Sequence, residues 1–173
     1  MIKKRKYLSY SLPFILFFMM LIDGHVSSAV LKVFSVPMDF TSNLLLLFLM
    51  FATFQMEKTY LVITSGIIGI LYDSYFYNVV GINFIILPLM VLVMYALFEH
   101  VYPNTFTLIL SFIVFVTAIS ISRVLLLTIF KLTDTTILDF FARTLAPTLV
   151  LNILLTSALV VPLKKMFNVG KQV

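Results

Sequence analysis

The stretch GIIGILYDSYFYNVVGIN, from Gly66 to Asn83, decides how this chain folds. It places one carboxylate, Asp73, directly after an apolar run that is long enough to enter a bilayer. Gly66 and Gly69 precede the carboxylate, and Gly81 follows it. Because a charged side chain in or near hydrocarbon is costly, Asp73 is expected to have either a partner or a function.

The composition predicts a membrane protein. The chain has 173 residues, of which 62% are hydrophobic and 11% charged, whereas about a quarter of the residues in a soluble domain are charged. The absence of cysteine excludes disulfides, thiol catalysis and thiolate metal sites. Two histidines are too few and too far apart for a metal cluster. The net charge of +5 does not indicate a nucleic-acid partner, because most cations lie at the chain ends beside hydrophobic runs.

Apolar runs of the length of a membrane span recur from end to end and leave no room for a soluble domain. We therefore expect an all-α membrane protein, with a single six-helix transmembrane domain over residues 1–173. The predicted spans cover about residues 7–22, 41–56, 59–77, 82–98, 105–130 and 140–163.

The positions of the cations predict the orientation. Basic residues near span ends stay in the cytoplasm, and an even number of spans puts both chain ends on one side. Both termini are therefore expected to be cytoplasmic. The cations that fit this orientation are Lys3, Lys4, Arg5, Lys6, Lys58, Lys164, Lys165 and Lys171. The connections from Val30 to Phe40 and from Lys131 to Asp139 would then face outward. The first of these is apolar, and it could either lie in the membrane surface or dock a partner.

Four charged residues are expected at similar depth in the outer half of the membrane. Asp73 lies roughly 21 Å from the cytoplasmic start of its span. By the same count, Asp23, Arg123 and Arg143 fall near the outer side. These groups could snorkel to the interface, but the favoured interpretation is that Asp73 pairs with Arg123 or Arg143 across helices.

Two local patterns concern helix contacts. Asp139 and Arg143 are four residues apart with the acid first, which favours a helical ion pair, usually an exposed one. Ser65, Gly66 and Gly69 give the third span a face of small residues that lets another helix approach closely. Packing within the chain is the preferred interpretation of this face, and dimerisation is the alternative.

The third-span motif resembles that of a known family. Gly66-Ile67-Ile68-Gly69-Ile70-Leu71-Tyr72-Asp73, followed by Gly81-Ile82-Asn83, is similar to the signature of the MreD family of rod shape-determining proteins. Chain length, the basic N-terminus and the six expected spans also look like this family. The chain departs from the pattern between Asp73 and Gly81, where relatives often have a further glycine.

The resemblance implies a role in the bacterial cell-wall elongation machinery of the cytoplasmic membrane. It implies a non-enzymatic scaffold that partners the bitopic protein MreC and acts with MreB, RodA and a class B transpeptidase. It implies no cofactor, and the sequence shows no convergent catalytic set. The family is also similar in fold to the substrate-binding subunits of energy-coupling-factor transporters, so a vitamin-type transporter subunit is the alternative. The candidate structural or partner-binding residues are Gly66, Gly69, Tyr72, Asp73, Gly81, Arg123, Arg143 and Asp23.

Overall fold

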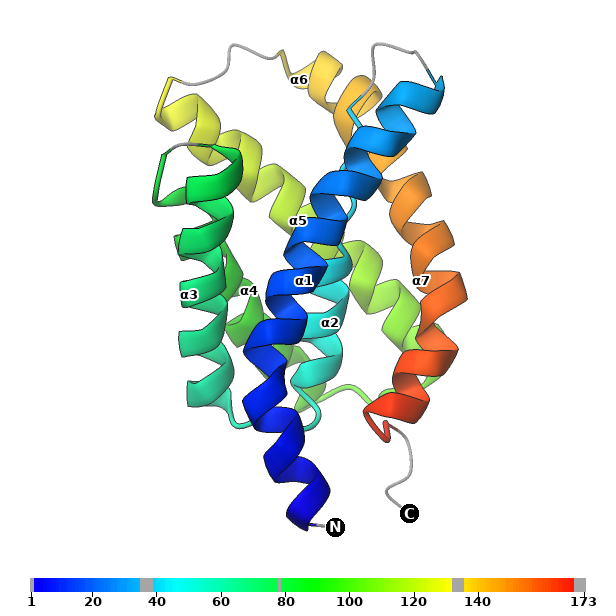
Figure 1. Ribbon diagram of the computed structural model, residues 1–173. Helices are drawn as coiled ribbons and strands as arrows, with labels where there is room; N and C mark the ends of the chain where they lie inside the picture. Colours follow the sequence, from blue (N-terminus) through cyan, green and yellow to red (C-terminus); the bar gives the residue numbers. More distant parts are fainter. Residues whose placement is uncertain (1, 35–38, 78, 132–135, 170–173) are drawn as a thin grey trace.

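The apolar runs of the sequence form helices that run up and down alongside one another (Figure 1). The computed structural model describes residues 2–34, 39–77, 79–131 and 136–169, and these contain no strand. The start of the first helix and the end of the last lie at the same end of the bundle (Figure 1). The helices are α1 (Ile2–Phe34), α2 (Leu44–Ala52), α3 (Lys58–Phe76), α4 (Ile82–Phe98), α5 (Thr105–Ile129), α6 (Ile137–Asp139), the π-helical turn η1 (Phe140–Leu145) and α7 (Ala146–Met166).

Within the described residues, three helical segments are long and apolar enough to cross a membrane: Tyr10–Val30, Thr105–Ile129 and Ile137–Met166. The third is continuous because α6, η1 and α7 follow one another without a break. α4 is shorter but equally apolar in character. The molecule is therefore an all-helical membrane protein. The helices α3, α4 and α5 begin and end within one residue of the ranges expected from the sequence.

The expected end of the first helical range at residue 22 was wrong. α1 continues through Asp23, Gly24 and His25 to Phe34. The polar residues do not stop the helix, because Asp23 is buried and bonded inside the bundle instead of facing water. Of the apolar outer segment predicted from Val30 to Phe40, the first five residues are helical and residues 35–38 lie outside the described residues.

The second expected range, 41–56, was also too long as a helix. α2 has nine residues, about 14 Å of helix, which is too short to cross about 30 Å of hydrocarbon. Every residue of α2 is buried, so it lies within the protein and not against lipid. Segment 39–43, which precedes α2, has no regular secondary structure. Such backbone is tolerated at membrane depth only where protein surrounds it.

The helices α3 and α4 approach each other closely at Gly69. A Cβ atom added to Gly69 would lie 2.6 Å from the carbonyl oxygen of Asn83 and 2.8 Å from the Cα of Phe84. The expected packing of this small face within the chain is confirmed for Gly69. In the turn between the two helices, Gly81 has a backbone φ of 133°, which residues other than glycine rarely adopt.

This close approach makes Gly69 and Gly66 a matched pair. We expect Gly69→Ala to lower the free energy of unfolding by about 1–3 kcal/mol, because the added methyl group meets rigid backbone. Gly66→Ala should change it much less, because its Cβ would lie 3.6 Å from Pro88 Cγ, an ordinary contact. Unfolding of both variants in mixed micelles, followed by circular dichroism, measures the difference. Equal effects would contradict the assignment of the contact to Gly69.

Candidate functional site

Three charged side chains from three helices meet in the interior of the bundle. Asp23 on α1, Asp73 on α3 and Arg123 on α5 are 2%, 0% and 8% exposed. All three belong to the layer of charges that the sequence predicted. We call them, together with Asn43 and Asn83, the charged layer.

Asp73 binds the start of the helix that follows it. Its two carboxylate oxygens accept hydrogen bonds from the backbone N–H groups of Gly81, Asn83 and Phe84 at 2.9, 2.8 and 3.1 Å. The side-chain amide of Asn83 donates a further bond at 2.8 Å. The first N–H groups of a helix lack partners within the helix and carry partial positive charge. Asp73 therefore caps the N-terminus of α4 across the turn.

Asp23 does the same for α2. Its carboxylate accepts bonds from the backbone N–H groups of Leu44 and Leu45 at 2.7 and 2.9 Å. The hydroxyl of Ser42 donates a third bond at 2.7 Å. Because α2 begins inside the bundle, its first N–H groups have no access to bulk water. The carboxylate thus satisfies donors that would otherwise be buried without partners.

Arg123 connects the two capped helices through asparagine side chains. Its Nε donates to Oδ1 of Asn83 at 3.1 Å, and its Nη1 approaches Oδ1 of Asn43 at 3.4 Å. The guanidinium carbon lies 5.4 Å from the ring centroid of Tyr72, within the range of a cation–π contact. Tyr72 is itself buried. Arg123 therefore holds the starts of α2 and α4 together.

The expected direct pairing of Asp73 with an arginine was wrong. Among the described residues, the one ion pair joins Arg143 and Asp139. Asp73 is linked to Arg123 only through Asn83, which donates to the acid and accepts from the base. The reason is that the oxygens of Asp73 are already occupied by donors of the turn and of α4.

Arg143 lies away from the charged layer, which corrects its predicted place. It is exposed and forms the predicted i,i+4 pair with Asp139, with 3.1 Å between Nε and Oδ1. Such an exposed pair contributes about 0–1 kcal/mol. Counting residues along a helix gives the height of a side chain but not the side on which it lies.

With both carboxylates ionised, the charged layer is close to electrically neutral. Two carboxylates carry two negative charges, and Arg123 carries one positive charge. Each helix N-terminus contributes about half a positive charge, so those of α2 and α4 together supply about one more. No buried side-chain nitrogen or oxygen in the described part of the chain lacks a hydrogen-bond partner. The layer is thus a closed network.

The irregular segment 39–43 is bonded to η1 and α7. The backbone N–H groups of alternate residues donate to the last helix: Asp39 to the carbonyl of Arg143 at 2.8 Å, Thr41 to the hydroxyl of Thr148 at 3.2 Å, and Asn43 to the side chain of Asn152 at 2.9 Å. The side-chain amide of Asn152 also donates to the carbonyl of Thr41 at 2.7 Å.

The spacing of these contacts follows from backbone geometry. Two residues of extended chain advance by about 6.6 Å, and four residues of helix advance by about 6 Å. Thr148 and Asn152 are four residues apart on the helix, so their spacing matches that of Thr41 and Asn43, and each can bond to its partner. The carbonyl of Arg143 lies in the π-helical turn, a kind of turn that often occurs at functional sites.

The residues also form a repeated pattern. Each of the long helices α1, α3 and α5 carries one charge of the layer. The part of the chain after each of them brings one asparagine: Asn43 directly before α2, Asn83 in α4, and Asn152 in α7. Since Asn152 bonds to Asn43, and Arg123 to Asn43 and Asn83, the three parts of the chain are joined at one level.

Sequence reasoning missed most of these polar partners. Thr41, Ser42 and Asn43 directly precede the leucine run, and residues of these types are typical of a helix start. Thr148, Asn152 and Thr156 are four residues apart in an apolar run, which places them on one face of a helix. Both signals were available, but neither shows which atoms they meet.

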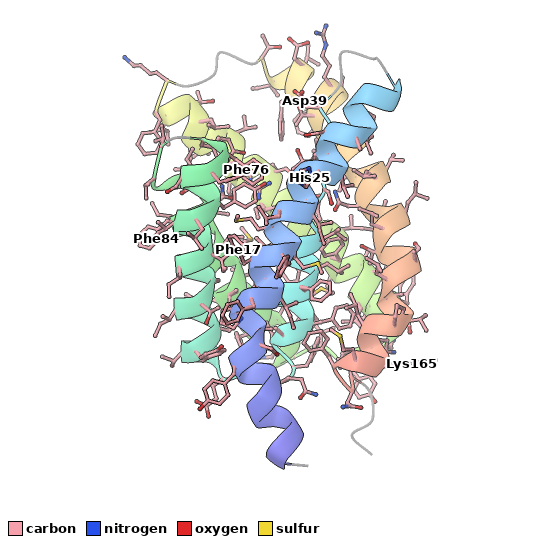
Figure 2. The ribbon with its side chains drawn as sticks, in the orientation of Figure 1. Phe17, His25, Asp39, Phe76, Phe84 and Lys165 are labelled. Atoms are coloured by element: carbon pink, nitrogen blue, oxygen red, sulfur yellow. The ribbon has the colours of Figure 1, made fainter. Side chains whose placement is uncertain are left out.

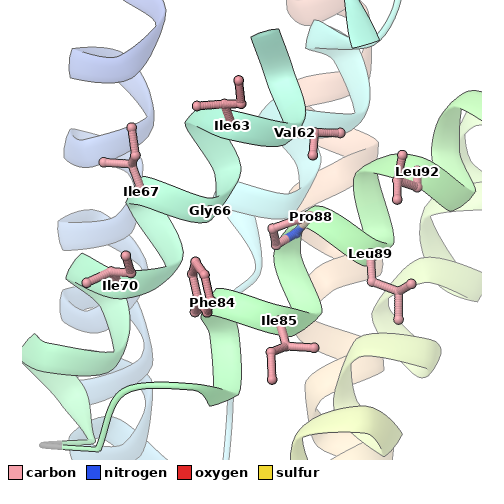
Figure 3. Close-up of a pocket in the computed structure, with 10 residues that line it drawn as sticks. All are labelled: Val62, Ile63, Gly66, Ile67, Ile70, Phe84, Ile85, Pro88, Leu89 and Leu92. Carbon is pink, nitrogen blue, oxygen red and sulfur yellow. The ribbon is translucent and has the colours of Figure 1, made fainter. Parts of the chain in front are cut away.

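The cavity found between α3 and α4 is apolar. It is a groove of about 580 Å³ bordered by Gly66, Phe84 and Pro88, and Figure 3 shows its aliphatic lining. Its other residues are Val62, Ile63, Ile67, Ile70, Ile85, Leu89 and Leu92. None of the charged-layer residues lines it. The side chains that line the groove are all apolar, so they offer a ligand no hydrogen-bonding side chain.

Comparison with known proteins identifies the family. The family described as rod shape-determining protein MreD matches residues 4–169. The chain belongs to the MreD family. It is also 30% identical over 137 residues to the cell shape-determining protein MreD of Streptococcus pneumoniae, covering 79% of this chain and 83% of that protein. No solved structure matches the chain. Membership of the MreD family supports a role in cell shape.

The capping of α4 in this MreD-family chain can be tested against an exposed acid. We expect Asp73→Ala to lower the free energy of unfolding by about 3 kcal/mol or more. Four donors lose their acceptor, and a buried unsatisfied donor costs about 1–3 kcal/mol. Asp139→Ala is the control and should cost at most about 1 kcal/mol. Unfolding in mixed micelles gives both values, and a small effect of Asp73→Ala would reject the cap.

The indirect link between Asp73 and Arg123 predicts coupling. In a double-mutant cycle, Asp73→Asn and Arg123→Gln should deviate from additivity by at least about 0.5 kcal/mol, because both act on Asn83. Asp73→Asn and Arg143→Gln share no partner and should be additive within that margin. Unfolding free energies of the single and double variants decide between the two outcomes. Additivity in the first cycle would show that Asn83 does not couple Asp73 to Arg123 energetically.

Proposed function

We propose that this MreD-family chain is a non-enzymatic membrane scaffold of the cell-wall elongation machinery. It crosses the cytoplasmic membrane as a bundle with both termini in the cytoplasm. Its main partner is an MreC-like bitopic protein, through which it acts with MreB, RodA and a class B transpeptidase. The fold and the family support a cell-shape role, and the details of topology and partners are our inference.

The observation that carries the proposal is the closed charged layer. Asp23, Asp73 and Arg123 are the buried charged residues of the described chain, and each is bonded to the bundle itself. Groups held in this way are not available as a nucleophile, base or ligand set. A protein whose interior polar groups serve only its own fold acts through its surfaces, as a scaffold does.

The orientation is supported by the charges at the two ends of the bundle. Lys164 and Lys165 end α7, and Lys58 begins α3. Figure 2 shows Lys165 at the end of the bundle where α1 begins, and Asp39 at the opposite end. Because basic residues remain on the cytoplasmic side, the lysine end is assigned to the cytoplasm.

The opposite end offers a surface for an extracytoplasmic partner. Ile137 and Leu138 in α6 are 77% and 83% exposed, and Phe141 in η1 is 51% exposed. These apolar side chains lie where the bundle would leave the membrane. Since the main domain of an MreC-like partner is extracytoplasmic, we assign its contact to this α6 surface.

The transporter alternative requires a polar cavity of ligand size in the outer half. The groove between α3 and α4 is not lined by a charged-layer residue, and neither is the small cavity beside Lys164 and Lys165. A thermal-shift screen of the purified protein with vitamin-like compounds tests this alternative. A tight ligand would reject the scaffold proposal.

The partner assignment predicts a selective loss of binding. Leu138→Asp should reduce recovery of the MreC-like protein severalfold in a pull-down from mild detergent, because a charge replaces an apolar contact. Tyr102→Asp is the control, since Tyr102 is 64% exposed in the connection between α4 and α5, at the other end of the bundle. The amount of each variant in the membrane is measured alongside.

The same strains test the role in cells. Depletion of the chain should round rod-shaped cells, and the Tyr102→Asp variant should restore the rod shape better than Leu138→Asp. Recovery of a transporter ATPase module in place of the MreC-like protein would overturn the proposal.

A further inference from the structure

Within the part of the chain that the structure describes, two lysines at the end of α7 have no carboxylate partner. Among the described residues, the single ion pair is formed elsewhere, by Arg143 and Asp139. The ammonium group of Lys164 instead donates to the hydroxyl of Thr105, the first residue of α5, at 3.0 Å. This bond joins α7 to α5 and fixes one positive charge between them. Lys165 follows it directly on α7 and is exposed.

A small cavity lies at this point. It has a volume of about 260 Å³ and is lined by Thr105, Val161, Lys164, Lys165 and Val169. Two ammonium groups and a hydroxyl therefore share a cavity with two valine side chains. Among the described residues, no acidic side chain lines it. The chemistry of the lining fits a ligand with an anionic group beside an apolar one.

The surroundings of the cavity also fit an amphipathic ligand. Lys165 lies at the end of the bundle (Figure 2), in the last turn of the segment Ile137–Met166, which is long and apolar enough to cross a membrane. The two helices that border the cavity expose apolar side chains next to it in sequence: Val161 is 53% exposed on α7, and Phe106 is 74% exposed on α5. A lipid bound here would have its headgroup beside the lysines and its chains along these side chains.

We propose that this cavity binds the headgroup phosphate of an anionic phospholipid. Basic pockets between membrane helices on the cytoplasmic side bind such headgroups, and ammonium groups near the membrane surface attract anionic lipid. Lys164, held by Thr105, supplies a fixed charge, and Lys165 supplies a second one. The valines contact the part of the lipid next to the headgroup.

Lys58 provides a control that distinguishes binding in this cavity from general electrostatic attraction of anionic lipid to the protein surface. It begins α3 at the same end of the bundle, directly after Glu57, and it lines neither cavity found in the described chain. If charge at the surface were sufficient, Lys58 would attract anionic lipid as well as Lys164 or Lys165 does. If the cavity is a binding site, Lys164 and Lys165 contribute far more to the binding of anionic lipid than Lys58 does.

The test is native mass spectrometry of the purified full-length chain with added lipid. Phosphatidylglycerol should bind the wild-type protein, and phosphatidylcholine should bind much more weakly. Lys164→Gln and Lys165→Gln should each weaken phosphatidylglycerol binding about fivefold. Lys58→Gln should change it less than twofold. Thr105→Val should weaken binding as Lys164→Gln does, while Thr105→Ser, which keeps the hydroxyl, should not.

Three results would overturn the proposal. The first is equal binding of the two lipids, and the second is an equal effect of Lys58→Gln and Lys164→Gln. The third is full displacement of phosphatidylglycerol by inorganic phosphate, which would identify a site for a free anion. Thermal melting followed by circular dichroism shows whether each variant is folded. Because the side chain of Lys165 is exposed, Lys165→Gln is expected to fold, and it tests the site by itself if Lys164→Gln does not fold.

Discussion

The structure depends on one requirement, which is that helices beginning inside the bundle must have their first N–H groups satisfied without bulk water. α2 and α4 both start beside buried carboxylates, and Asp23 and Asp73 meet this requirement. Two buried carboxylates then need positive charge close by. The helix termini supply part of it, and Arg123 supplies the rest through two asparagine side chains. The charged layer is therefore required because two helices, α2 and α4, begin inside the bundle.

The two capped helices differ in how far along the chain their contacts reach. Asp73 meets residues eight to eleven positions away, so the turn from α3 to α4 can form by itself. Segment 39–43 bonds to residues of α7 that are 107 to 111 positions away. Its backbone is satisfied only once the last helix is in place. The hairpin of α3 and α4 is thus a local unit, whereas α1, α2 and α7 stabilise one another only in the complete bundle.

The parts of the fold that were predictable from the sequence are those in which hydropathy and local spacing decide. The limits of α3, α4 and α5, the common level of Asp23, Asp73 and Arg123 in the bundle, and the pair of Asp139 with Arg143 are of this kind. The sequence left open whether α2 lies against lipid or inside the protein, because leucine is equally suited to both. The asparagine bridges were not predictable either, since their partners come from distant parts of the chain. The side on which Arg143 lies depends on helix rotation, which depth does not give.

The two ends of the bundle expose different residues, and neither set belongs to the charged layer. Because the charged layer uses its polar groups internally, recognition is left to exposed residues. One end presents lysines beside a small cavity, and the other presents the apolar side chains of α6 and η1. An anionic headgroup held at the lysine end would fix the depth and tilt of α5 and α7 in the membrane. Since η1 continues directly into α7, fixing α7 would also fix the height of the α6 surface, to which we assign the proposed extracytoplasmic partner. This continuous connection would serve the scaffold role that we propose, in which the chain acts on both sides of the membrane.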